Sequence, residues 1–375
     1  MAYDEVAFGR RGGQGDDARD RLGVHLGWEV VLLLGAAALG FLLYRLDPAS
    51  LRRPALDDLL ITGTAIGLLT LGVGVTLRAG VPNLAVGPIA LAASLHFAEN
   101  GDLGLVKAAV PALAIAAVGG LVAGLLIVTL HVPGWVVTLG AGMGVIVYDQ
   151  LRTAPVAVQG RYDPSNQAFF LFGGFALLAV LGGAVGALEP VRRRLGAMRA
   201  ATDPALRRKG TALPVIGSLV ASSVFAIVAG ILLAAQSSRP IVPGTGLEWT
   251  GIALGTALVA GTSAYGRRGG IFGTLLAVVA MTLYLDYADR RAFHIALFAT
   301  AACAVGGGLV ITRLVETYGR SRTVPDAEPD WQPDPPAEST TSPTWRPDLP
   351  ETWSTGVGAQ RRGDQWDDGP WGGGR

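Results

Sequence analysis

The sequence predicts an all-α fold, a polytopic transmembrane helical bundle of about ten membrane segments with disordered cytoplasmic tails. Half of the 375 residues are hydrophobic and only 16% are charged, whereas soluble globular chains carry about a quarter charged residues. Apolar runs long enough to cross a bilayer recur along the chain, and the composition changes completely after about residue 320. These observations indicate one membrane domain followed by a tail.

The membrane segments are predicted from the apolar runs, because a helix needs about 20 apolar residues to cross a hydrocarbon core of about 30 Å. Seven full runs cover 28–46, 58–78, 108–130, 168–188, 213–235, 270–288 and 294–313, and three shorter or Gly/Pro-interrupted ones cover 81–98, 133–151 and 250–266. We expect a cytoplasmic N-terminal tail over 1–27 and a membrane domain over 28–314.

The basic residues predict the orientation. With ten crossings, both termini and the arginine-rich loop at 189–212 share one side, and that side holds nearly twice as many basic residues as the other. Cytoplasmic loops are enriched in Lys and Arg, so this side is expected to be the cytoplasm. Abundant Ala and Gly, with Lys107 and Lys209 as the only lysines, suggest a bacterial plasma membrane.

The C-terminal segment 315–375 is rich in Pro, Asp and Glu from about residue 323 and holds five of the eight tryptophans. Such a stretch buries too little apolar surface to offset its ordering entropy, so we expect disorder. Two similar hexapeptides, Pro329–Asp334 and Pro343–Asp348, each contain a tryptophan between prolines. They fit a docking peptide for a cytoplasmic partner, an aromatic contact with the membrane surface, or a low-complexity extension.

No catalytic, cofactor-binding or metal-binding motif is present in the sequence. It has no GxxxxGKS/T phosphate loop, no HExxH, no CxxC and no GxSxG. The ionisable residues within or near the apolar runs are His96, Asp149, Asp286 and His294. Because Asp149 and Asp286 end predicted segments, where hydration lowers the cost of a charge, we expect boundary residues rather than a proton relay. The chain is therefore not expected to be an enzyme.

Glycines and prolines interrupt one predicted segment, and glycine pairs in others permit close packing between helices. Residues 79–88 place two prolines and two glycines at the start of a crossing. Non-helical backbone at membrane depth is tolerated where protein or a water-filled cavity surrounds it, so this stretch fits either a substrate path or a kinked packing helix. Glycine pairs at four-residue spacing, such as Gly120 and Gly124 or Gly182 and Gly186, indicate closely packed helices.

Four motifs in register resemble the ribose-type sugar permeases of ABC importers. Asn83-Leu-Ala-Val-Gly87-Pro-Ile-Ala-Leu resembles their DLSVGSxxAL segment, and Pro133-Gly-Trp-Val-Val-Thr138-Leu-Gly140 resembles PxFIVTLG. The stretch Gly246-Leu-Glu248-Trp-Thr-Gly-Ile-Ala is similar to GYELDAIAA, and residues 260–276 resemble GGTSLFGGRGSxxGTLLG. Order and spacing agree from about residue 60 to 313.

The resemblance implies functional positions. Those on a possible translocation path are Asn83, Gly87, Thr138 and Gly140, and the family signature falls on Gly261, Thr262, Ser263, Gly266, Gly270 and Gly273. In the 189–212 loop the family's GGNPEAARLSGI coupling segment corresponds to Asp203, Pro204, Ala205, Arg207 and Gly210. An Asp-Pro pair also favours the start of a helix in general. The Asp carboxylate accepts hydrogen bonds from the first backbone amides, and proline is well suited to the first turn. A basic loop that only sets topology is the alternative.

The resemblance also implies the activity. The chain would be the permease subunit of an ATP-binding-cassette importer that moves a sugar or similar small polar solute by alternating access. Its partners would be a second permease subunit, cytoplasmic ATPase subunits that hold ATP and magnesium, and an extracellular solute-binding protein. The cofactors thus lie outside this chain. A branched-chain amino acid or nucleoside permease is one alternative, and a membrane scaffold that recruits cytoplasmic proteins through its Trp/Pro tail is another.

Overall fold

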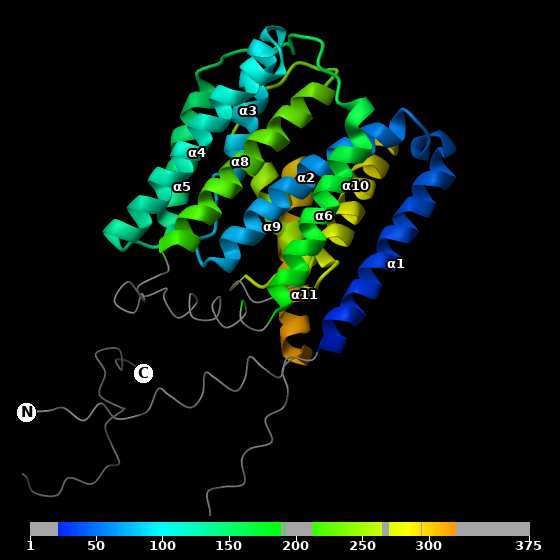
Figure 1. Cartoon of the computed structure of the whole chain (residues 1–375). Helices are drawn as coiled ribbons and strands as arrows, with labels where there is room; N and C mark the ends of the chain where they lie inside the picture. The colour runs from blue at the N-terminus through cyan, green and yellow to red at the C-terminus, as the bar shows by residue number, and fades with distance from the viewer. Residues whose placement is uncertain (1–21, 189–190, 192–211, 265–269, 294, 320–375) are drawn as a thin grey trace, which may run out of the picture. The chain divides into compact units, whose positions relative to one another are not determined.

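The computed structural model describes residues 22–188, 191, 212–264, 270–293 and 295–319, and every structural statement below concerns these residues (Figure 1). Each of the ten predicted apolar ranges contains an α-helix. The helices are α1 (Leu22–Leu46), α2 (Ala55–Arg78), α3 (Val86–Asn100), α4 (Leu105–Leu130), α5 (Gly134–Gln150), α6 (Ala168–Ala187), α8 (Ala212–Gln236), α9 (Leu247–Val259), α10 (Gly273–Arg290) and α11 (Leu297–Gly319). The all-α prediction is confirmed for these residues, in which Val156 and Ile241 form an isolated β-bridge and no strand occurs.

Six helices are long and apolar enough to cross a membrane: α1, α2, α4, α6, α8 and α11. Helices α3, α5 and α9 are shorter, with 15, 17 and 13 residues. The last two turns of α10 carry Asp286, Asp289 and Arg290. By length and composition, these six helices of the described residues indicate a transmembrane protein. The predicted number of ten crossings is larger than the number of helices that meet both criteria.

Helix α4 places most of its large apolar side chains outside and its small ones inside. On α4, Ile115 and Val106 are 73% and 70% exposed, whereas Ala108, Ala112 and Ala116 are buried. In lipid, helices associate through close backbone approach, which small residues permit. Accordingly, a Cβ atom added at Gly120 would lie 2.8 Å from Val220 Cα, and one added at Gly124 would lie 2.8 Å from Ile216 Cα. The predicted packing role of this glycine pair is confirmed.

Helices α2–α5 and α8–α11 form two halves that run in opposite directions (Figure 1). We call the end at which α1 begins and α2 ends the lower end, and the opposite end the upper end. Helix α2 descends, an extended connection over 79–85 turns back into the bundle, and the short α3 ascends from its interior. Helix α8 ascends, residues 237–246 turn back, and the short α9 descends.

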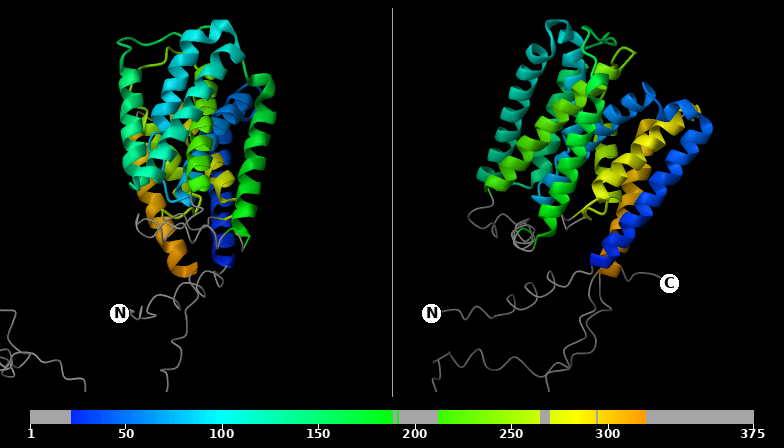
Figure 2. Two further views of the ribbon diagram at one scale, coloured as in Figure 1. Left: turned by 60° about the vertical axis from the view of Figure 1, so that its left-hand side comes forward. Right: turned by 45° about the vertical axis from the view of Figure 1, so that its right-hand side comes forward.

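The contacts between the halves are reciprocal. Helix α2 packs on α9 and α10, and its counterpart α8 packs on α3 and α4. Within each half, α3 contacts α5 and α9 contacts α11, while α2 meets α8 and α3 meets α9 across the centre. This order, with opposite direction, is that of an inverted-topology repeat. Outside the repeat, α1 lies along α10 and α11 (Figure 2), and α6 packs on α2 and α10.

Polar contacts join the helix ends at the upper end. Arg290 at the end of α10 donates to Asp286 Oδ2 at 2.7 Å and to Asp47 Oδ2, just after α1, at 2.6 Å. Gln236 at the end of α8 donates to the Asp58 carbonyl of α2 at 2.9 Å. Asp286 thus occupies a partly hydrated helix end, as predicted.

The glycine stripe of α4 provides a test of this packing. Gly120→Ala should lower the free energy of unfolding by about 1–3 kcal/mol, because the new methyl group collides with the α8 backbone. Gly119→Ala is the matched control, since nothing lies within 4 Å of its added Cβ. Thermal unfolding of both variants in detergent, followed by circular dichroism, measures the difference. Equal melting temperatures for the two variants would contradict the α4–α8 packing.

Candidate functional site

The 79–85 connection between α2 and α3 is largely buried although it is not helical. Val81, Asn83 and Ala85 are at most 4% exposed. Side chains from three helices hold this backbone: Thr76 Oγ1 accepts from the Asn83 amide at 3.2 Å, Thr138 Oγ1 donates to the Pro82 carbonyl at 2.8 Å, and Thr250 Oγ1 donates to the Leu84 carbonyl at 3.2 Å. Buried backbone groups need such partners.

The Asn83 side chain completes this arrangement. Its Nδ2 donates to Ser222 Oγ of α8 at 3.0 Å, and its Oδ1 accepts from the Ala85 amide at 3.0 Å. The side-chain amide thus joins α8 to the turn that starts α3. Residues 79–88 therefore form a buried extended connection followed by a new helix, rather than a helix with a kink.

The starts of α3 and α9 meet beside this connection. The Gly87 amide donates to Thr250 Oγ1 at 3.0 Å. A Cβ atom at Gly87 would lie 2.1 Å from the Gly246 carbonyl oxygen, and one at Gly246 would lie 2.7 Å from the Gly87 oxygen. Gly246 also has a φ of 67°, a left-handed conformation that glycine adopts readily. Only glycine at both positions permits this crossing of two broken segments.

A cavity of about 430 Å³ lies among α3, α4, α5 and α8, next to the crossing. Its walls are mostly alanine, glycine and aliphatic residues. Its polar lining consists of Asn83, His96, Thr138, Tyr148 and Ser223. This volume and composition fit a small-molecule site, which is typically apolar with a few orienting polar groups.

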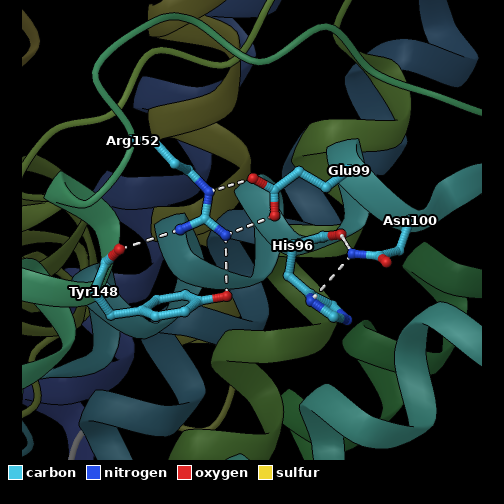
Figure 3. Close-up of polar contacts among 5 residues, drawn as sticks. All are labelled: His96, Glu99, Asn100, Tyr148 and Arg152. Atoms are coloured by element: carbon cyan, nitrogen blue, oxygen red, sulfur yellow. Dashed lines mark hydrogen bonds and ion pairs between the residues drawn. The ribbon is translucent and has the colours of Figure 1, made fainter.

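A polar cluster lies at the upper end of this cavity (Figure 3). Arg152, just after α5, binds the Glu99 carboxylate of α3 in a bidentate ion pair, with Nη2 at 2.6 Å from Oε2. Arg152 Nη2 also donates to the Tyr148 hydroxyl at 3.0 Å, and its guanidinium lies over the Tyr148 ring. The hydrogen bond to Glu99 raises the pKa of Arg152 above its ordinary value.

His96 connects the cluster with the cavity wall. Its Nε2 lies 3.1 Å from the Ala108 carbonyl of α4, and Asn100 Nδ2 lies 3.4 Å from its Nδ1. The side chains of His96 and Tyr148 both line the cavity. Tyr148 contacts Arg152 of the ion pair, and His96 contacts Asn100 beside it. The pair Glu99–Arg152 thus joins the upper ends of α3 and α5 over the cavity.

Asp149 contradicts the prediction of a hydrated boundary carboxylate. Its side chain is 0% exposed, and neither carboxylate oxygen has a hydrogen-bond partner in the structure described. It belongs to the buried face of α5 with Gly134, Thr138 and Gly142. The prediction was wrong because the face of α5 that carries Asp149 packs against the protein and does not face an open surface. His294 lies outside the described residues.

The structure places the four predicted path residues differently from one another. Asn83 and Thr138 line the cavity, although both also hold the 79–85 connection. Gly87 lies at the α3–α9 crossing instead. Gly140 lies on an exposed face of α5 with nothing within 4 Å of its added Cβ.

The described signature residues lie where α9 joins α10 at the lower end. Gly261 has a φ of 88°, and Thr262 and Ser263 are each 2% exposed. A Cβ atom at Gly273 would lie 2.3 Å from the Ala260 carbonyl oxygen, which explains the need for glycine there. Gly266 and the coupling-loop residues Asp203, Pro204, Ala205, Arg207 and Gly210 lie outside the described residues.

Two adjacent residues of α1 hold this junction. Trp28 Nε1 donates to the Val259 carbonyl at the end of α9, at 2.8 Å. Glu29 Oε1 accepts from the Phe272 and Gly273 amides at the start of α10, at 2.7 and 3.1 Å. Both helix termini therefore gain a partner for an otherwise unsatisfied backbone group. Sequence reasoning assigned Trp28–Glu29 no role, since an apolar helix with one carboxylate gives no sign of its partner.

Comparison with protein-family models, curated proteins and solved structures finds no match to this chain. Within the described ranges, no group of three or more His, Cys, Asp or Glu side chains is placed to hold a metal ion.

The Glu29 contacts predict a graded loss of stability. Glu29→Leu should lower the free energy of unfolding by about 1–3 kcal/mol, because two amides at the start of α10 lose their acceptor. Glu29→Gln should lose less, since its side-chain oxygen can still accept. Thermal unfolding in detergent tests the order wild type, Gln, Leu. A leucine variant as stable as wild type would exclude Glu29 as the cap of α10.

Proposed function

We propose that this chain is the membrane-spanning permease subunit of an ATP-binding-cassette importer for a sugar or a similar small polar solute. In this proposal the chain crosses the plasma membrane ten times, with both termini and the 189–212 loop in the cytoplasm. A second permease subunit completes the pathway, and partner ATPase subunits hold ATP and magnesium. An extracellular binding protein delivers the solute.

The observation that carries the proposal is the pair of broken segments that meet inside the bundle. Helices α3 and α9 both begin there, in opposite directions, and Gly87 contacts Gly246 and Thr250. Transporters with inverted repeats place discontinuous helices of this kind around the solute path near the bilayer midplane. The four motifs that resemble sugar permeases include both of these segments, at residues 83–91 and 246–253.

The cavity supports a small solute as cargo. Its volume of about 430 Å³ falls within the range of small-molecule pockets. Tyr148 offers an aromatic surface, and Ser223 and His96 offer hydrogen-bonding groups. The cavity lining contains no carboxylate or other acidic group among the described residues, which favours an uncharged polar solute over a cation.

The cavity also suggests how access alternates. In the proposed orientation, the Glu99–Arg152 pair lies on the extracellular side and joins α3 to α5 above the cavity. ATPase closure would move the 189–212 loop and with it the helices that this loop connects. Rigid-body motion of packed helices is a common form of such coupling. Separation of α3 from α5 would then open the cavity to the outside.

ATP-dependent uptake by the assembled transporter tests the proposal. Uptake should require the ATPase subunits that copurify with this chain, and Gly210→Trp should reduce uptake by about tenfold or more by weakening the coupling between loop and ATPase. Membrane insertion and the melting temperature of the variant should match wild type. Uptake that survives loss of the ATPases would refute the importer, while normal uptake by Gly210→Trp would refute only the coupling assignment.

A cavity-filling variant tests the site itself. Gly119 lines the cavity and has nothing within 4 Å of its added Cβ, so Gly119→Leu should fit and occupy the space needed by the solute. We expect uptake to fall about tenfold or more, equivalent to a lost 1.4 kcal/mol. Gly140→Leu is the matched control on the exposed face of α5. Equal uptake by the two variants would place the path elsewhere. Competition by amino acids or nucleosides rather than sugars would identify the alternative cargo.

A further inference from the structure

A second cavity lies at the lower end, away from the crossing. It has a volume of about 170 Å³ and is enclosed by α2, α6, α8, α9 and the start of α10. Its polar lining consists of Arg78, Thr70, Thr262 and Thr274, and the other lining residues are apolar or glycine. None of the described lining residues is acidic. Among its described lining residues there is thus one cation and no acidic group.

Arg78 is the last residue of α2, and its side chain turns into the bundle. Its Nε atom is buried without a hydrogen-bond partner, and the part of the chain that is described offers its guanidinium no ion pair. Helix α6 makes room for it: Gly182 lines the cavity, and a Cβ atom at Gly186 would lie 3.8 Å from Arg78 Nη1. Because no backbone of another described helix lies within 4 Å of a Cβ atom added at Gly182 or Gly186, the close helix packing expected at this pair is not found.

An arginine placed in this way is costly. A buried Nε donor without a partner costs free energy, and arginine is suited to bind planar or tetrahedral oxyanions through its fork of donors. The cost is offset if an anion occupies the cavity.

The hydroxyl groups around Arg78 complete a set of donors. Thr262 is 2% exposed, and its side chain lines the cavity. Thr274 lies in the first turn of α10, and its side chain lines the cavity. Thr70 donates its hydroxyl proton to the Ile66 carbonyl at 2.7 Å, so it contributes mainly to the wall.

We propose that the cavity formed by Arg78, Thr262 and Thr274 binds a phosphate group. The group is either inorganic phosphate or the phosphodiester of a lipid headgroup, both of which present oxygens to a guanidinium and two hydroxyls. The site is separate from the cavity beside the α3–α9 crossing. It does not depend on the proposed transport activity, and binding can be measured without transport.

Calorimetric titration of the full chain, purified in detergent without added lipid, tests the site. Inorganic phosphate at constant ionic strength should bind and raise the melting temperature, because a ligand of the folded state stabilises it. Arg78→Gln should abolish both effects. Arg313→Gln is the matched control, since Arg313 is an exposed arginine of α11, and it should bind as wild type does. Thr262→Val, which keeps the side-chain shape, should weaken binding about tenfold.

A second titration distinguishes the two sources. Dihexanoyl phosphatidylglycerol below its micellar concentration should bind more tightly than inorganic phosphate, and compete with it, if a lipid headgroup is the natural occupant. Weaker binding of the lipid assigns the site to free phosphate. No binding of either probe by wild type overturns the proposal, and so does equal binding by wild type and Arg78→Gln. If Arg78→Gln does not fold, Thr262→Val decides instead, because it leaves Arg78 in place, and its binding both probes as tightly as wild type overturns the site.

Discussion

The structure depends on how one non-helical stretch is satisfied inside a helical bundle. The amides of residues 79–81 bind carbonyls at the end of α2, but residues 82–84 are not helical and are at least partly buried, so side chains supply partners for them. Thr76, Thr138 and Thr250 bind this backbone directly, and Asn83 reaches Ser222. These residues come from α2, α5, α9 and α8. Polar side chains from four helices thus fix one connection, and through it the relative positions of both halves.

The satisfied connection also positions the cavity. Asn83 and Thr138 line it while they hold the backbone, so its inner wall is rigid. Beyond its His96 and Tyr148 lining lies a different interaction, the Glu99–Arg152 pair between two helix ends. An ion pair of which Glu99 remains about one-third exposed contributes little stability. The wall of the cavity therefore contains neutral hydrogen-bonding groups, and charges join the helix ends beside it.

At the lower end, side chains of another helix also supply partners for backbone groups where two helices are joined. Trp28 and Glu29 of α1 bind the end of α9 and the start of α10, so α1 holds the junction that carries the described signature residues. The sequence contained these residues but not their relation, because they are more than 230 positions from their partners. Asp149 shows the same gap: it stands at the end of an apolar run, where the sequence predicts contact with water, but packing buries it.

The sequence by itself determined the helices. Each of the ten apolar ranges contains one, since the length and apolarity of a run are local properties, and glycine spacing correctly indicated the close packing of α4 on α8. It also marked 79–88 as irregular, leaving open whether this was a kink or a path. Only the tertiary structure decided that α3 begins inside the bundle at Val86 and crosses α9 at Gly87 and Gly246. It alone showed where the two cavities lie and which polar groups line them. The physical reason is that a buried polar group takes its partner from whichever helix packs beside it, and no local pattern records that choice.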